Sequence, residues 1–352
     1  MVFDFDNTLI CGDIGEATLA VLARCGVLTP ATVPKHLCPA FRAGGKRLVR
    51  IESCADVTEY YEALLEPTSY GARDPQPLAT GYAWVVQAME NLKLADVVRA
   101  TRAAFEWSDP AHPGFIDVTP GRTAYPVPFF YPEMIELLAE LLRHRFDVWI
   151  VSASNVWSVR WVMLKSLNPL LRQCGVRTGL CPDHVIGIST LLVDRRNRLC
   201  KDAVLVREDD AYAQLDKAVL SHLRLTSVLH YPVPTYAGKI AAIFDCLGRN
   251  PYLVAGDSPG DLPMLAIAAH RLWIARLTKP QYQRTALEWF RQSATRPWLV
   301  QPTLASRANG FLPYSNDTRG LLPIPTQQVR LSLELLAPAF ADCPKRRTCS
   351  IT

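Results

Sequence analysis

Two kinds of hydrophobic pattern follow one another along this chain: short apolar runs, and apolar residues repeated at helical spacing. The first apolar run ends in two carboxylates one residue apart, Asp4 and Asp6. Apolar residues then recur at helical spacing over residues 14–22, which predicts a helix that Asp13 caps and Gly26 ends. The start of the chain therefore predicts a strand, a loop and a helix.

The carboxylate pair needs an explanation, because side chains at i and i+2 of a strand share one face. A continuing strand would hold the charges of Asp4 and Asp6 side by side. We therefore expect the strand to end at Asp4, a loop to begin at Asn7 and Thr8, and a cation to lie between the carboxylates. Only three residues precede Asp4, whereas a buried parallel strand usually has about five or six, which leaves room for a natural leader before this sequence.

Residues 29–125 show few strand patterns. They contain helical patterns over residues 56–66 and 84–105, joined by loops that contain proline and glycine. The Pro-rich stretch 125–128 has the composition of a linker that returns the chain to its first unit. These features predict a mainly helical insertion at residues 13–125.

Strand and helix patterns alternate again after residue 126, which is typical of a parallel sheet. Strands are expected at residues 146–155, 252–255, 271–275 and 298–301, and helices at 133–145, 240–247, 281–292, 327–336 and from 262 onward. A hairpin expected at residues 185–199 marks a smaller insertion at about 176–235. The predicted fold is α/β: a doubly wound, Rossmann-like parallel-sheet core of residues 1–12 and 126–352, with the helical cap insertion at 13–125.

Composition narrows the function classes. The 352 residues are 49% hydrophobic and 20% charged, as in an ordinary globular protein with a sizeable core. The net charge of +5 is spread along the chain, and the one dense basic run, Lys345–Arg347, is interpreted as a solvated tail, so no nucleic-acid partner is expected. No apolar run approaches the length of about 18 residues that indicates a membrane span, which predicts a cytoplasmic protein without a membrane partner. The ten cysteines include no C-x-x-C pair and are interpreted as reduced thiols.

Four groups of polar residues occur where strands end or helices begin. They are Asp4–Thr8, Ser152, Lys239 and Gly256–Asp261. Residues just past the carboxyl ends of neighbouring parallel strands converge on one crevice, so these groups are expected to meet. Lys165 and Lys201 compete with Lys239 for the lysine position, although neither opens a helix just before the strand that leads to Gly256.

These residue types suit phosphoryl transfer. A carboxylate such as Asp4 can attack phosphorus to form an aspartyl-phosphate, while Asp6 can protonate the leaving alcohol and then deprotonate the attacking water. Ser152 and Lys239 offer donors to the phosphoryl oxygens. Magnesium prefers oxygen ligands, which Asp4, Asp257 and a backbone carbonyl can supply.

In this order the four groups resemble the four motifs of the haloacid dehalogenase superfamily of phosphohydrolases, over most of the chain outside the two insertions. The resemblance implies that Asp4 is the nucleophile and a magnesium ligand. It implies that Asp6 is the general acid/base and a ligand through its carbonyl, and that Ser152 and Lys239 bind the phosphoryl group.

The same resemblance implies that Asp257 ligates magnesium and that Asp261 supports it. The large helical insertion looks like the superfamily's first (C1-type) cap class, which includes phosphoserine phosphatases. The stretches 12–17 and 297–302 look most similar to the phosphorylcholine-phosphatase-like branch.

The sequence therefore predicts a magnesium-dependent phosphatase acting on a small phosphorylated metabolite, with phosphocholine-like and phosphoserine-like compounds as candidates. One alternative is a phosphotransferase that passes the same aspartyl-phosphate to an alcohol. Another is a non-catalytic binding protein that keeps the fold. The intact set of motif residues argues against the second alternative, because a relic would be free to lose any of them. The oligomeric state is not indicated.

The sequence leaves the recognition of the leaving group open. Asp13 and Glu16 lie one turn apart, where they either pair with a cationic substrate group or act as helix N-terminal carboxylates favoured by the dipole. Aromatic residues of the insertion either cage a quaternary ammonium or belong to the core. These aromatic residues are Tyr60, Tyr61, Tyr82, Trp84 and Trp107. Arg42, Lys46 and Arg47 either meet an anionic substrate or lie in a solvated loop.

Overall fold

The structure is a computed structural model that describes residues 1–44, 47–66, 80–107, 114–201, 221–292, 298–304 and 326–341. The predictions for Lys46, for residues 202–220 and for the basic run at 345–347 concern residues outside these ranges. None of the described helices combines the length and the apolar character that a membrane crossing needs.

The main sheet has six strands, all parallel, in the order β15-β14-β13-β1-β8-β9. The strands are β1 (Val2–Phe3), β8 (Trp149–Asn155), β9 (Val185–Ile188), β13 (Leu253–Gly256), β14 (His270–Arg276) and β15 (Trp298–Thr303). The first strand lies in the middle, where Phe3 pairs with Ala255 of β13 and with Ile150 of β8. This sheet confirms the predicted α/β fold.

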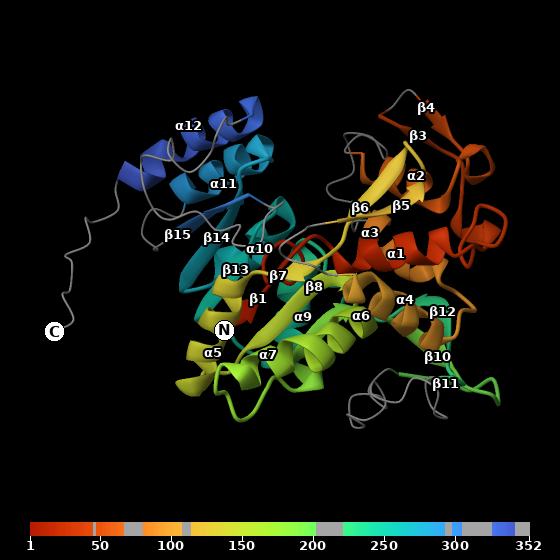
Figure 1. The fold of residues 1–352 in the computed structure, drawn as a ribbon, viewed down its shortest axis with the longest axis horizontal. Coiled ribbons are helices and arrows are strands. Elements are labelled where there is room, and N and C mark those ends of the chain that lie inside the picture. The colour runs from red at the N-terminus through yellow and green to blue at the C-terminus, as the bar shows by residue number, and fades with distance from the viewer. Residues whose placement is uncertain are drawn as a thin grey trace.

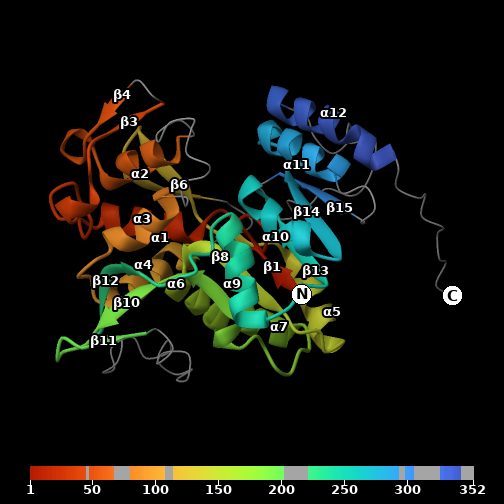
Figure 2. The ribbon, with the colours of Figure 1, turned by 180° about the vertical axis from the view of Figure 1, so that it is seen from behind.

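Helices cover both faces of this sheet, as Figures 1 and 2 show from opposite sides. One face carries α5 (Pro132–Arg143), α6 (Val156–Val162) and α7 (Asn168–Gln173), and the other carries α9 (Ala237–Leu247) and α10 (Leu262–Ile267). Neighbouring residues of β1 accordingly enter different hydrophobic clusters, Val2 with Val254 and Phe3 with Ile150. A parallel sheet needs apolar residues on both faces for this reason. Helices α11 (Pro280–Gln292) and α12 (Gln327–Ala341) pack beside β14 and β15.

The insertion begins with α1 (Ile14–Arg24), where Asp13 accepts a hydrogen bond from the Glu16 N–H as the predicted N-cap. It continues through α2 (Val57–Leu65), α3 (Thr80–Ala88) and α4 (Leu94–Glu106). The single helix predicted over residues 84–105 was wrong. Asn91 has a left-handed backbone with φ +67°, and its N–H donates to the Leu225 carbonyl, so the chain breaks into two helices there.

Two hairpins in the insertion were not predicted from the sequence. They are β3 (Phe41–Ala43) with β4 (Arg47–Val49), and β5 (Phe115–Thr119) with β6 (Thr123–Pro126). The predicted linker at 125–128 therefore begins inside β6. Buried Ile116 alternates with exposed neighbours, a strand pattern that is only a few residues long. Strand β2 (Ile10–Cys11) pairs antiparallel with β7 (Phe129–Phe130) and ties the two ends of the insertion together.

The predicted hairpin at 185–199 also needs a correction. Strand β9 joins the main sheet beside β8, and the hairpin consists of β10 (Thr190–Val193) and β11 (Leu199–Cys200) alone. Strand β12 (Arg224–Leu229) completes this small sheet on the other side of β10. Buried residues follow one another along β9, which indicates a strand covered on both faces rather than an alternating one. Gly187 permits this packing, because a Cβ there would meet the Val156 Cα at 2.7 Å.

Candidate active site

Strand β1 delivers Asp4 and Asp6 to the centre of the carboxyl edge of the main sheet. The Asp4 N–H donates to the Ala255 carbonyl of β13 at 2.9 Å, so Asp4 is still held by the sheet. The chain then turns at Asn7, whose φ of +56° lies in a left-handed region that asparagine tolerates better than most residues. Both carboxylates are buried, and they contact different partners: Asp4 contacts Lys239, and Asp6 contacts Ser152.

Lys239, in the first turn of α9, reaches across the sheet to two carboxylates. Its Nζ donates to Asp4 Oδ1 at 2.6 Å and to Asp261 Oδ1 at 2.5 Å. Burial alone would lower the pKa of Lys239, but the charges of Asp261 and Asp4 outweigh it and raise that pKa. Burial, followed by the charge of Asp261, raises the pKa of Asp4. Lys239 is thus a permanent cation in contact with Asp4. The two competing lysines lie elsewhere: Lys165 is exposed, and Lys201 lines a different cavity.

The loop after β13 places Asp257 and Asp261 beside Asp4. One oxygen of Asp261 accepts from Lys239, and the other accepts from the Asp257 and Ser258 N–H groups and the Ser258 hydroxyl. Both oxygens of Asp261 are therefore engaged by groups of the protein. Its role is to hold Lys239 and the backbone that carries Asp257.

Asp4 Oδ2 and Asp257 Oδ1 face a single shared donor. The Thr8 hydroxyl lies 3.2 Å from the first oxygen and 3.4 Å from the second, and it has one proton to donate. Acidic oxygens of Asp4, Asp257 and Asp261 all lie within 4.8 Å of one another. The two under-satisfied oxygens of Asp4 and Asp257 fit a divalent cation that takes carboxylate ligands.

Arg276, at the carboxyl end of β14, was not singled out from the sequence. Its Nη1 donates to Asp257 Oδ2 at 3.0 Å, and its side chain is mostly buried. Burial raises the pKa of Asp257 to about 6, although Arg276 lowers it. A cation directly after an apolar strand in a parallel sheet was the available signal, because that position faces the same crevice.

Asp6 is held by three donors. Its Oδ1 accepts from the Ile14 N–H at 2.7 Å, and its Oδ2 accepts from the Ser152 hydroxyl at 2.9 Å and the Ser154 hydroxyl at 2.8 Å. Burial, followed by the charge of Asp13, raises the pKa of Asp6 to about 7. A carboxyl with this pKa can both donate and accept a proton near neutral pH.

Ser152 makes its side-chain contact with Asp6 in this structure. Its hydroxyl donates to Asp6, and the residue does not line the cavity beside Asp4. Ser154, two residues along β8 on the same face, makes an equal contact with Asp6 and was not singled out from the sequence. Phosphoryl binding by Ser152 stays a prediction, whereas the structure shows both serines orienting Asp6.

A cavity of about 130 Å³ opens beside these groups. Its lining combines acidic, cationic and aromatic residues from the core and from the insertion. They include Asp4, Asp6, Asp13, Tyr82, Tyr236, Lys239, Asp257, Arg276 and Tyr282. Of the residues predicted from the sequence, the lining includes Asp4, Asp6, Asp13, Lys239 and Asp257.

Beside the cavity, the insertion forms a small acidic and aromatic pocket that shares Asp13 and Tyr82 with the cavity and adds Glu16 and Tyr61. Asp13 accepts from the Ser154 hydroxyl at 3.3 Å as well as capping α1. Glu16 accepts from the Tyr61 hydroxyl at 3.0 Å, and Tyr82 lies beside both carboxylates. Burial, followed by the charge of Glu16, raises the pKa of Asp13 to about 7, and burial also raises the pKa of Glu16.

The other residues considered for leaving-group recognition lie away from this cavity. Tyr60 and Trp84 are core residues whose polar atoms donate to the Pro39 and Leu37 carbonyls. Trp107 is exposed under Arg24. Arg47 pairs with Glu66 at 3.2 Å on the surface, and Arg42 does not line the cavity.

Comparison with known proteins gives the following matches. Residues 1–266 match the family described as haloacid dehalogenase-like hydrolase. A solved protein of Anaerococcus prevotii DSM 20548, described as conserved and functionally unknown, is 18% identical, with a TM-score of 0.51 over 89% of this chain and 87% of that one. This similarity shows a shared fold.

Two solved phosphoserine phosphatases have TM-scores of 0.36. The substrate-bound structure is 13% identical in sequence, and the match covers 81% of this chain and 88% of that chain. The apo structure is 12% identical, and the match covers 85% of this chain and 91% of that chain. The comparison with curated proteins found no match.

Proposed function

The chain belongs to the haloacid dehalogenase-like hydrolases, and on this premise we propose that it is a magnesium-dependent phosphomonoesterase of small phosphorylated metabolites. The observation that carries the proposal is the buried contact of Lys239 with Asp4, next to a second carboxylate whose oxygen is short of donors. In the same proposal residues 13–125 act as a cap over a core of residues 1–12 and 126–352. The insertion contributes Asp13 and Tyr82 to the cavity lining, which supports this division.

The chemistry follows from the positions of the two aspartates. An Asp4 oxygen attacks phosphorus, the bond from phosphorus to the leaving alcohol breaks, and Asp6 gives its proton to that alcohol. Water then attacks the aspartyl-phosphate, Asp6 takes the water proton, and the bond between phosphorus and Asp4 breaks. Lys239 stays charged throughout and lies where it can offset the charge on the phosphoryl oxygens.

The donor set supports a magnesium site. The site contains two cations, Lys239 and Arg276, and four buried carboxylates. The carboxylates are those of Asp4, Asp6, Asp257 and Asp261. If all four are ionised, two negative charges are left without a compensating cation. Asp4 and Asp257 would hold the ion, together with the Asp6 carbonyl expected from the family resemblance. Bound magnesium would supply positive charge to the phosphoryl group. Asp261 would position Lys239 and Asp257 rather than bind the ion.

Metal-free protein should be more stable at pH 5.5 than at pH 8. The pKa of Asp6 is raised to about 7 and that of Asp257 to about 6, so the folded chain binds more protons than the unfolded chain between about pH 4 and 7. The stabilisation that comes from these bound protons is complete at low pH, and it is lost as the pH rises through the pKa values of the folded protein. The measurement is the thermal midpoint in EDTA at both pH values.

With magnesium, the thermal midpoint should be higher at pH 8 than at pH 5.5, because magnesium binds the ionised carboxylates and therefore stabilises the folded protein more at pH 8. The Asp6→Asn variant is the control and should show a smaller dependence on pH in EDTA. A metal-free wild type that melts higher at pH 8, with the same dependence in Asp6→Asn, would contradict the buried-carboxylate account.

We further propose that the substrate carries a cationic group beside the phosphate ester. Asp13 and Glu16 are both half-buried at the start of α1, where they line a small pocket with Tyr61 and Tyr82. Asp13 and Tyr82 also line the catalytic cavity, so the two spaces adjoin. Two carboxylates with raised pKa values gain most from a cation that lets them ionise. The anionic alternative finds less support, because neither Arg42 nor Arg47 lines the catalytic cavity or the adjoining pocket of Asp13 and Glu16.

Replacing Glu16 by glutamine should therefore separate two substrates. The kcat/KM for phosphocholine should fall about tenfold to a hundredfold, which is the loss expected when an interaction with a charged group is removed. The kcat/KM for an aryl phosphate without a cationic group should hardly change. Glu62→Gln is the matched control, because Glu62 contacts Tyr125 and lines neither the catalytic cavity nor the small pocket that Glu16 shares with Asp13. Equal losses on both substrates would exclude recognition of a cation by Glu16.

The experiment that tests the whole proposal is phosphate release by the full chain from a generic aryl phosphate, phosphocholine, phosphoethanolamine and phosphoserine, with magnesium and with EDTA. Turnover that EDTA abolishes is the expected result. Acceptor alcohols in the same assay distinguish the phosphotransferase, which would release alcohol in excess of free phosphate. No turnover on any of these esters would favour the non-catalytic binding protein.

A further inference from the structure

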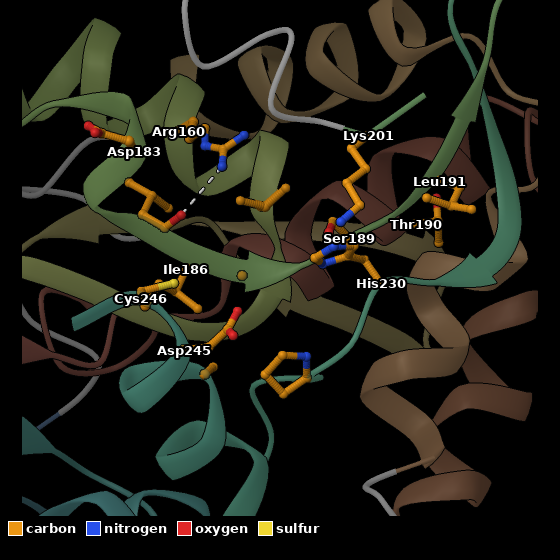
Figure 3. Close-up of a pocket in the computed structure, with 15 residues that line it drawn as sticks. Arg160, Asp183, Ile186, Ser189, Thr190, Leu191, Lys201, His230, Asp245 and Cys246 are labelled. Carbon is orange, nitrogen blue, oxygen red and sulfur yellow. Dashed lines mark hydrogen bonds between the residues drawn. The ribbon is translucent and has the colours of Figure 1, made fainter. Parts of the chain in front are cut away.

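A second cavity lies apart from the catalytic one, between β9, α6, α9 and the small sheet (Figure 3). Its volume is about 530 Å³, compared with about 130 Å³ for the catalytic cavity, and the two share no lining residue. The volume lies within the range of small-molecule sites, roughly 300–1,000 Å³. Nothing in the proposed phosphatase reaction uses this cavity.

One end of the cavity gathers hydrogen-bond donors. In Figure 3 the Lys201 side chain extends toward Ser189 and His230, and Thr190 lies to one side of them, beside Leu191. Within the described residues, neither the Lys201 ammonium nor the His230 ring has a hydrogen-bond or ion-pair partner. Thr190 is 1% exposed, and its hydroxyl has no partner in the described structure. A buried hydroxyl without a partner is unfavourable, and a bound acceptor would satisfy it.

The rest of the cavity has a different character. Val156, Ile186 and Ala242 form an apolar wall from α6, β9 and α9. Asp183 and Asp245 lie away from Lys201 in Figure 3. The cavity therefore has a cationic, hydroxyl-lined end and an apolar body, and its carboxylates lie elsewhere.

We propose that this cavity is a binding site for a small organic anion. The anionic group, a phosphate, carboxylate or sulfonate, lies between Lys201, His230 and the hydroxyls of Ser189 and Thr190. The apolar part packs on Ile186, Val156 and Ala242. This site does not depend on the proposed phosphatase activity, because it shares no residue with it.

A matched pair of fluorescent probes tests the proposal on the full chain. Anilinonaphthalene sulfonate combines an apolar body with an anion, and N-phenylnaphthylamine is the same body without the charge. We expect saturable binding of the sulfonate at least about tenfold tighter than that of the neutral probe, since tenfold corresponds to about 1.4 kcal/mol for the anion contacts.

Two variants assign the binding to this cavity. Lys201→Glu should remove the preference for the sulfonate, and Thr190→Val should reduce it by about threefold to tenfold while keeping the shape of the side chain. Lys165→Glu, the same change on an exposed lysine outside the cavity, should bind both probes like the wild type. Equal affinities for the two probes, or sulfonate binding that survives Lys201→Glu unchanged, would overturn the proposal.

Discussion

Replacing Asp4 by asparagine should lower the turnover of an aryl phosphate by at least about 10³-fold, because loss of a covalent nucleophile removes the reaction path rather than one contact. The change keeps the size of the side chain. Burial and the charge of Asp261 raise the pKa of Asp4, which means that its ionised form is unfavourable in the folded protein. Removing this carboxylate should therefore not lower the melting temperature of the metal-free protein below that of the wild type. Stabilisation by magnesium should shrink, because Asp4 is one of two expected carboxylate ligands. Initial rates and thermal midpoints with EDTA or magnesium check all three results.

Asp6→Asn is the matched comparison, since it makes the same chemical change two residues away. An aryl phosphate has a good leaving group that needs little help from an acid. Asp6→Asn should therefore release about one equivalent of phenolate in a burst and then turn over slowly, because water attack still needs the base. Asp4→Asn should show no burst. A burst in Asp4→Asn, or turnover close to wild type, would remove Asp4 from the role of nucleophile.

Replacing Lys239 by methionine should have the second largest effect, on stability as well as activity. The change keeps the length of the side chain but leaves Asp4 and Asp261 buried and facing each other without the shared cation. Breaking a buried ion pair in this way costs about 3–5 kcal/mol of unfolding free energy. Removing a positioned donor from the phosphoryl oxygens should lower kcat about 10²-fold to 10³-fold. Denaturant unfolding and steady-state kinetics measure the two effects.

The stability loss should diminish as pH falls from 8 to 5.5, because protonation relieves the repulsion between the two carboxylates. The double variant Lys239→Met with Asp261→Asn removes one of these charges and should recover part of the stability but none of the activity. Lys165→Met and Lys201→Met are controls for the two lysines that compete with Lys239 in the sequence. If Lys201→Met lost activity while Lys239→Met kept full activity, the catalytic lysine would be Lys201 and not Lys239.

Much of the fold was predictable because its signals are local. The helix after Asp13 follows from apolar spacing and a capping residue, and the strands of the main sheet follow from apolar runs with helices between them. The errors occurred where a long-range contact decided the outcome. Asn91 breaks a helical pattern beside Leu225, and β9 pairs with β8 although its sequence also suited a hairpin.

The sequence by itself singled out Asp4, Asp6, Lys239 and Asp257 and predicted that a parallel sheet would gather them, since a carboxylate pair after an apolar run is visible in a few residues. It did not single out Arg276 or Ser154. Only the tertiary structure decided their pairing: Lys239 between Asp4 and Asp261, Arg276 on Asp257, and Ser152 on Asp6 rather than in the cavity. It also decided that Lys201 lines a separate cavity. The physical reason is that local patterns set where a strand ends, whereas the direction and partner of a buried side chain depend on residues as far as 249 positions away.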